Sequence, residues 1–271
     1  MKTLVRNETL SLRLCQDLAE IAETVAEEWI QLLRTRKPSP LPPCIALSGG
    51  RTAQPLYEAV VRKTQNQKEL WREVHFFFAD ERWVPFDHSD SNYRIAQQYL
   101  FDPLEIPTWN RHGLYIGPDR DYACAVGQAD LVRLAPASVR GQPMLDLLLL
   151  GMGEDGHIAS IFPDTPRSVA ESQKVYVPVD APKPPPERIS LTLPVMQETR
   201  EAWVLIVGEG KEEALRRSLD PVPATPLGEL IQRRQALRLP TRLWLTCDLA
   251  EKAGLLPETE ASSPKEKEIR E

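Results

Sequence analysis

The sequence has 271 residues, 42% hydrophobic side chains and a formal net charge of −6, so it can bury a substantial core within one domain. The negative charge argues against sequence-independent nucleic-acid binding, because affinity for the phosphate backbone requires a clustered excess of Lys and Arg. No apolar run approaches the roughly 20 residues of a membrane-spanning helix, and the N-terminus lacks a secretory hydrophobic region, so we expect a cytoplasmic protein.

The N-terminal third predicts a helix followed by a β-turn-α unit. Apolar residues at three- and four-residue spacing predict an amphipathic helix over residues 11–36, which the proline-rich stretch 37–43 ends. The short apolar run CIAL at 44–47 predicts a buried strand. The sequence SGG closes that strand, and a helix is expected to start near Thr52.

Strands and helices continue to alternate along the chain. Residues 145–150 form the clearest strand, since a run of leucines followed by glycine fits a parallel strand covered on both faces. Further predicted strands cover residues 74–78, 113–116, 174–179, 188–193, 203–207 and 243–246, with helices over 91–100 and 121–134. This alternation predicts an α/β fold with a doubly wound, mostly parallel sheet and helices on both faces.

Two segments bear on domain boundaries. The prolines of residues 178–186 indicate an exposed connection and not a domain boundary. Residues 258–271 are charged and lack periodic apolar positions, so we expect a disordered tail after a single catalytic domain over residues 1–257. The four cysteines are scattered singly, which fits reduced thiols and gives neither the spacing of a metal site nor a disulfide scaffold.

Ligands of open α/β sheets bind at the carboxyl ends of the strands, so the loops after the strands are the places to search. The first is SGGRT at 48–52, where Gly49 and Gly50 permit close backbone approach and the helix N-terminus offers N–H groups to an anion. Arg51 and Thr52 add side-chain donors. A tight turn in which the glycines serve only backbone geometry explains this segment equally well.

The second loop is DERWVP at 80–85. Arg82 can hold a phosphate bidentately, while Asp80 and Glu81 can orient it or bind hydroxyl groups. The alternative interpretation is a surface ion cluster near a strand end.

The third and most specific loop is GMGEDGHIASIFP at 151–163, directly after the clearest strand. Its glycines surround Asp155 and His157. Histidine is the usual general base near neutral pH because its unperturbed pKa is roughly 6.5, and a neighbouring carboxylate can hold the ring and stabilise its charged form. The other histidines, at positions 75, 88 and 112, lack this setting and are interpreted as structural or surface residues.

Together, these three loops resemble the 6-phosphogluconolactonase family, which shares a Rossmann-like fold with the glucosamine-6-phosphate deaminases. Further matching elements are SNYR at 91–94, RISLTL at 188–193 and GEGK at 208–211. The deaminases share the Asp-Gly-His element but carry DEY and an Asn-Glu-Pro stretch, where this sequence has DER and IFP. Both departures favour the lactonase.

The resemblance implies hydrolysis of 6-phosphogluconolactone to 6-phosphogluconate in the oxidative pentose phosphate pathway, with a phosphosugar lactone as the substrate and no cofactor. We expect no metal, because the sequence offers no clustered His, Cys or carboxylate set with the spacing of metal ligands. We infer no nucleic-acid, membrane or obligatory protein partner. The resemblance also implies that residues 49–52 bind the phosphate, with Arg82 and Arg188 as cationic partners. His157 would be the base.

Two further residue assignments follow from the same comparison. Asp155 or Asp80 would orient His157 or the substrate, and the sequence does not rank the two carboxylates. Lys211 is a weaker candidate for anion contact, and the preferred interpretation is an ordinary solvated lysine at a helix start. With this assignment, His157 removes a proton from the attacking water, and the donors that stabilise the oxyanion are not identified.

Three other functions fit parts of the pattern. A sugar-phosphate deaminase or isomerase would share the fold, and a non-catalytic sugar-phosphate-binding regulator would need the arginines and glycines but no histidine base. A nicotinamide oxidoreductase is disfavoured because no GxGxxG follows the first predicted strand, and a serine nucleophile is disfavoured because no GxSxG is present.

Overall fold

The computed structural model describes residues 2–256. At its centre is a seven-stranded sheet with the strand order β1-β2-β10-β9-β6-β3-β4. Its strands are β1 (Lys2–Val5), β2 (Leu10–Cys15), β3 (Cys44–Leu47), β4 (His75–Phe78), β6 (Leu147–Gly151), β9 (Glu201–Ile206) and β10 (Thr241–Thr246). Every neighbouring pair is parallel except β1 and β2, which confirms the mostly parallel sheet.

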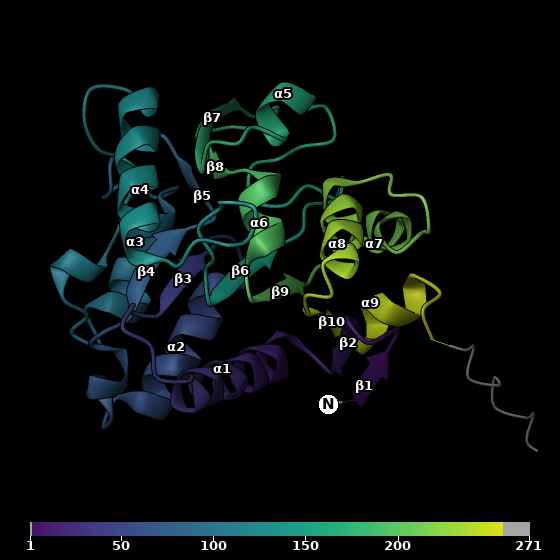
Figure 1. Ribbon diagram of the computed structural model, residues 1–271. Coiled ribbons are helices and arrows are strands. Elements are labelled where there is room, and N and C mark those ends of the chain that lie inside the picture. Colours follow the sequence, from purple (N-terminus) through teal and green to yellow (C-terminus); the bar gives the residue numbers. More distant parts are fainter. Residues whose placement is uncertain (1, 257–271) are drawn as a thin grey trace, which may run out of the picture.

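Helices cover both faces of this sheet. Figure 1 shows α1 and α2 on one face and α6 and α8 on the other. The helices are α1 (Leu18–Thr35), α2 (Ala53–Thr64), α3 (Asn92–Ala96), α4 (Arg120–Leu134), α5 (Arg167–Ala170), α6 (Leu193–Glu198), α7 (Glu212–Ser218), α8 (Pro226–Ala236) and α9 (Cys247–Lys252). None of the helices described is long and apolar enough to cross a membrane.

A second, antiparallel sheet lies beside the first and has the strand order β5-β8-β7. Its strands are β5 (Asp80–Arg82), β7 (Tyr176–Asp180) and β8 (Glu187–Leu191). The strands predicted at 174–179 and 188–193 therefore exist, but they do not join the parallel sheet. The proline-rich segment 178–186 is only partly a connection, because its first residues belong to β7 and pair with β8.

Two predicted elements were wrong. The helix expected over residues 11–36 begins only at Leu18, where the Asp17 side chain accepts a hydrogen bond from the Glu20 amide and caps it. The preceding residues form β2, since alternate leucines point into the core at the two-residue spacing of a strand. No strand forms over 113–116, which is irregular. The single domain over 1–257 stays a prediction, and the tail at 258–271 lies outside the described residues.

The sheet topology fixes where a ligand can bind. Strand β3 pairs with β4 on one side and with β6 on the other, and the chain visits β4 first. The crossover direction therefore reverses between β3 and β6, and α/β sheets open a crevice at the carboxyl ends of two such strands. The SGGRT loop follows β3 and the GMGEDGH loop follows β6, so the fold brings both loops to this crevice.

Candidate active site

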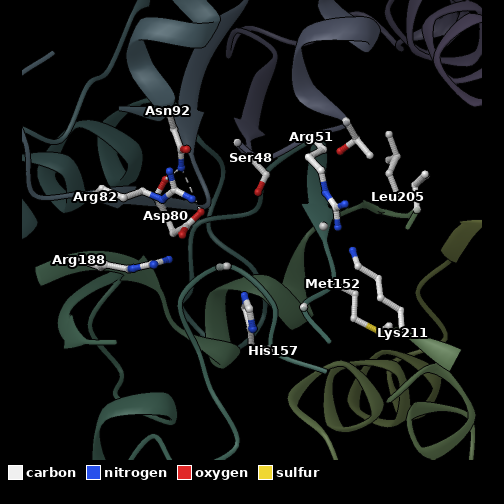
Figure 2. Close-up of a pocket in the computed structure, with 17 residues that line it drawn as sticks. Ser48, Arg51, Asp80, Arg82, Asn92, Met152, His157, Arg188, Leu205 and Lys211 are labelled. Carbon is white, nitrogen blue, oxygen red and sulfur yellow. Dashed lines mark hydrogen bonds between the residues drawn. The ribbon is translucent and has the colours of Figure 1, made fainter. Parts of the chain in front are cut away.

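A cavity of about 220 Å³ lies at the carboxyl ends of β3 and β6 (Figure 2). It brings together eight of the nine candidate residues, which come from four separate stretches of the chain. They are Gly49, Gly50, Arg51, Thr52, Asp80, Arg82, His157 and Arg188. The ninth, Asp155, contacts the His157 ring.

The His157 ring is held by Asp155. The ring Nδ1 lies 2.5 Å from Asp155 Oδ1, and the same oxygen accepts a hydrogen bond from the His157 backbone amide at 3.1 Å. Partial burial opposes ionisation of Asp155, but these hydrogen bonds outweigh it and lower the pKa of the carboxyl. An ionised Asp155 makes Nδ1 the donor, so Nε2 is left as the basic nitrogen. Figure 2 shows the ring pointing into the cavity.

The glycines of this loop leave room for the ring. A Cβ atom on Gly153 would lie 2.0 Å from His157 Nδ1, and Gly156 has a φ of +83° with Thr225 packed against it. A side chain at Gly153 would displace the His157 ring, and one at Gly156 would displace Thr225 and strain the backbone. The placement of His157 therefore requires the glycine at position 153.

Asp80 has different partners from Asp155. It is buried, its Oδ2 accepts a hydrogen bond from Ser160 Oγ at 2.7 Å, and Asn92 Nδ2 donates to its carbonyl oxygen at 2.9 Å. Of the two carboxylates that the sequence left unranked, Asp155 is thus the one in contact with His157. Asp80 belongs to the opposite wall.

Two arginines share that wall. Arg82 on β5 lies directly opposite Arg188 on β8. Arg82 Nη1 donates to the carbonyl oxygen of Asp90 at 2.7 Å, and Arg188 Nε donates to that of Pro185 at 3.0 Å. Burial lowers the pKa of Arg188, which the nearby Asp80 charge opposes. Like charges opposite one another on paired strands repel, so an anionic group between them would stabilise the arrangement.

A second pair of cations lies at the other end of the cavity. The Arg51 guanidinium packs on Gly208, where an added Cβ would lie 2.8 Å from Nη2. Burial, and then the nearby Arg51 charge, lowers the pKa of Lys211 to about 8. The interpretation of Lys211 as a solvated lysine was therefore wrong, because the side chain is half-buried and lines the cavity. Within residues 2–256, neither cation forms an ion pair with a carboxylate.

The two cation pairs flank the histidine. Figure 2 shows Arg82 and Arg188 on one side of His157, and Arg51 and Lys211 on the other. Such a cavity suits an anionic ligand that is long enough to contact both cation pairs and to lie beside His157 between them. The sequence missed Asn92 as a lining residue and gave Lys211 only as a weaker candidate for anion contact, although both lie in segments that match the family, SNYR and GEGK.

Known proteins with similar sequences and folds place the chain in a family. The family model for glucosamine-6-phosphate isomerases and 6-phosphogluconolactonase matches residues 16–238. A 6-phosphogluconolactonase of Mycobacterium tuberculosis is 36% identical over 214 residues, which are 73% of this chain and 85% of that protein. The structure of a Thermotoga maritima 6-phosphogluconolactonase superposes with a TM-score of 0.66 at 26% identity, covering 88% of this chain and 98% of the other.

A monomeric glucosamine-6-phosphate deaminase shares the fold as well, with a TM-score of 0.71 at 17% identity over 89% of this chain and 99% of the deaminase. The architecture alone therefore does not separate the two reactions. The chain belongs to the family of glucosamine-6-phosphate isomerases and 6-phosphogluconolactonases.

Proposed function

We propose that the protein hydrolyses 6-phospho-D-glucono-1,5-lactone to 6-phospho-D-gluconate, with His157 as the general base. The observation that carries this proposal is the pairing of His157 with Asp155 beside a cavity lined by cations at both ends. The relatives named 6-phosphogluconolactonase support the reaction. The DER and IFP segments further favour it over deamination, since they depart from the deaminase pattern.

The phosphate is assigned to the end of the cavity that holds Arg51 and Lys211. There the loop 49–52 leads into α2, whose N-cap residue Thr52 makes no side-chain capping hydrogen bond, so backbone N–H groups remain for an anion. The opposite wall carries the buried Asp80 carboxylate, which would repel a phosphate. This assignment differs from the expectation that Arg82 and Arg188 bind the phosphate. Both arginines are instead assigned to the lactone ring at the opposite end of the cavity.

The chemistry follows from this orientation. His157 Nε2 takes a proton from a water molecule as the water oxygen attacks C1 of the lactone. The carbonyl oxygen becomes an oxyanion, which Arg82 and Arg188 stabilise. The tetrahedral intermediate then collapses by breaking the bond between C1 and the ring oxygen. The ring oxygen leaves with the proton from the imidazolium, which restores the neutral base and gives the carboxylic acid, and this ionises.

We propose that this reaction needs no metal ion. Within residues 2–256, no group of three or more His, Cys, Asp or Glu side chains is placed to hold one, and His157 with Asp155 supplies the base that a metal-bound hydroxide would otherwise provide. Dialysis of the purified protein against EDTA should leave turnover unchanged. Loss of turnover that zinc or magnesium restores would contradict this part of the proposal.

The reaction itself is tested with freshly generated lactone, subtracting spontaneous hydrolysis. Accelerated formation of 6-phosphogluconate supports the lactonase. Release of ammonia from glucosamine 6-phosphate without lactone turnover would identify a deaminase instead. Tight binding of 6-phosphogluconate without either reaction would identify a non-catalytic sugar-phosphate-binding protein.

A further inference from the structure

The carboxylate of Glu81 is buried beside the cavity without a cation to neutralise it. Glu81 is only 1% exposed. Within residues 2–256, its carboxylate forms no ion pair. Its oxygens are instead surrounded by donors of the backbone. Oε1 accepts hydrogen bonds from the amides of Arg82 and Asn92, both at 2.8 Å, and Oε2 accepts one from the amide of Tyr93 at 2.8 Å.

These donors belong to two elements that build one wall of the cavity. Arg82 is the last residue of β5, and Asn92 is the first residue of α3. The Ser91 hydroxyl, which caps α3, is a fourth donor to Glu81 at 3.3 Å from Oε2. One carboxylate therefore ties β5 to α3, although nine residues separate the two elements.

The hydrogen bonds around Glu81 favour its charged form. An ionised carboxylate accepts hydrogen bonds only, whereas the protonated acid carries an O–H donor. Oε1 faces two backbone N–H groups, so a proton there sets donor against donor. A proton on Oε2 requires the Ser91 hydroxyl to turn from donor to acceptor. In either case the hydrogen bonds between the strand and the helix lose their charge assistance and weaken.

We propose that Glu81 is a positioning residue of the active site: its carboxylate holds Arg82 and Asn92 in the cavity wall, and its neutralisation weakens this hold. The inference rests on the proposed function and adds to it a residue that does not touch the substrate. Burial, partly offset by the backbone hydrogen bonds, raises the pKa of Glu81 to about 7. The wall is therefore built from a group that changes charge near neutral pH.

No ionisable group near Glu81 within residues 2–256 takes over the role of its carboxylate in holding Arg82 and Asn92. Asp80 on the same strand is a carboxylate and raises the Glu81 pKa further. Tyr57 of α2 is fully buried, and burial followed by the Glu81 charge raises its pKa, so its hydroxyl stays neutral. On β8, the residue opposite Glu81 is the apolar Ile189. The neighbouring Arg82 guanidinium donates a hydrogen bond to the backbone carbonyl of Asp90.

The sign of the effect on anion binding separates positioning from plain electrostatics. Removing a negative charge near an anion site should tighten anion binding if the charge acts only through its field. Loss of positioning should weaken binding. Glu81→Gln is nearly isosteric, and its amide group places a donor where backbone N–H groups already point, so it mimics the protonated acid.

The experiment measures the affinity of wild type and Glu81→Gln for gluconate 6-sulfate from about pH 6 to about pH 8, on either side of the Glu81 pKa. A sulfate ester is chosen because a phosphate has a second pKa of about 6. At pH 8 the variant should bind about 10-fold more weakly, as expected for the loss of one or two charge-assisted hydrogen bonds. Near pH 6 the difference should nearly vanish, because wild-type Glu81 is then protonated. Lys211, whose pKa is about 8, titrates in both proteins, so its effect cancels in the ratio.

Glu198→Gln is the matched control. Glu198 is also a buried glutamate, but it pairs with Arg140 at 3.1 Å and lies in α6, away from the cavity. Its neutralisation should leave the affinity unchanged. A Glu81→Gln protein that is folded but binds the sulfate ester equally or more tightly, or with a ratio independent of pH, would overturn the proposal.

A measurement on the wild type covers the case in which Glu81→Gln does not fold. The backbone amide proton shifts of Arg82, Asn92 and Tyr93 should titrate together near pH 7, since all three donate to one carboxylate. Absence of that common titration would overturn the inference. If the wild type hydrolyses no lactone and binds no sulfate ester, the proposed function fails and this inference fails with it. If the wild type hydrolyses the lactone but the affinity ratio of wild type to Glu81→Gln does not change with pH, only the role of Glu81 is rejected.

Discussion

Asp155 Oδ1 contacts His157 twice, through the ring Nδ1 at 2.5 Å and through the backbone amide at 3.1 Å. The first contact selects the tautomer with a basic Nε2. The second holds the backbone of His157 against the Asp155 carboxylate. A residue that sets both features of the base should be nearly as important for turnover as the base itself.

Asp155→Asn should lower kcat by roughly 10²- to 10⁴-fold, the contribution typical of general base catalysis. An asparagine can donate to Nδ1, which would place the ring proton on Nε2 and remove the base. Asp164→Asn, which changes an exposed acid directly after this loop, is the matched control and should keep wild-type kcat. Both proteins are compared by steady-state kinetics on the lactone after their folding has been checked by circular dichroism. Wild-type kcat in Asp155→Asn would refute the role of the carboxylate.

Arg51→Gln and Lys211→Gln should discriminate between phosphorylated and unphosphorylated substrates. Each lost charge-assisted hydrogen bond should lower kcat/KM for 6-phosphogluconolactone by roughly 10- to 100-fold. The kcat/KM for glucono-1,5-lactone, which has no phosphate, should change little. Arg188→Gln should lower both values, because this arginine is assigned to the lactone carbonyl. A reversed pattern would place the phosphate between Arg82 and Arg188.

Gly153→Ala should lower kcat by about 10²-fold, because its Cβ would lie 2.0 Å from His157 Nδ1 and a displacement of about 1 Å at a catalytic group has effects of this size. Gly151→Ala in the same loop should have a smaller effect, since a Cβ there meets no atom within 4 Å. Crystal structures of the two variants would show whether the ring has moved. Equal kcat values for the two alanine variants would contradict the steric explanation.

Glu81 should make folding stability depend on pH. Burial raises its pKa from 4.5 to about 7, so the folded protein binds this proton more tightly than the unfolded chain. The resulting stabilisation is fully present below about pH 4.5 and is lost as the pH rises through about 7. Relative to Glu81→Gln, the wild type should lose on the order of 3 kcal/mol between these limits. Urea denaturation at about pH 5 and about pH 8.5 measures the difference, and a constant difference would contradict the raised pKa.

The sequence predicted most of the parallel sheet because its strands are short apolar runs followed by glycine or polar turns. Residues 44–47 match β3 residue by residue. It predicted His157 and the SGGRT loop for the same reason, since both follow such strands and the topology brings strand ends together. These features depend on local pattern and on one general property of α/β sheets.

The remaining features depend on contacts that are distant in sequence. Residues 10–15 form β2 because β10 pairs with them, although their apolar spacing also extends into the following helix. Strand β5 has only three residues, all polar, and it exists because β8 pairs with it. The pairing of Arg82 with Arg188 and the burial of Lys211 follow from that tertiary arrangement. No local pattern in the sequence could have predicted them.

The most direct test of the account is the turnover of freshly generated 6-phosphogluconolactone by the wild type and by His157→Ala, with spontaneous hydrolysis subtracted. The account predicts that the wild type forms 6-phosphogluconate and that His157→Ala lowers kcat/KM by roughly 10²- to 10⁴-fold while the protein stays folded. Wild-type kcat/KM in His157→Ala would contradict the assignment of the base, and a wild type without lactone turnover would contradict the proposed reaction.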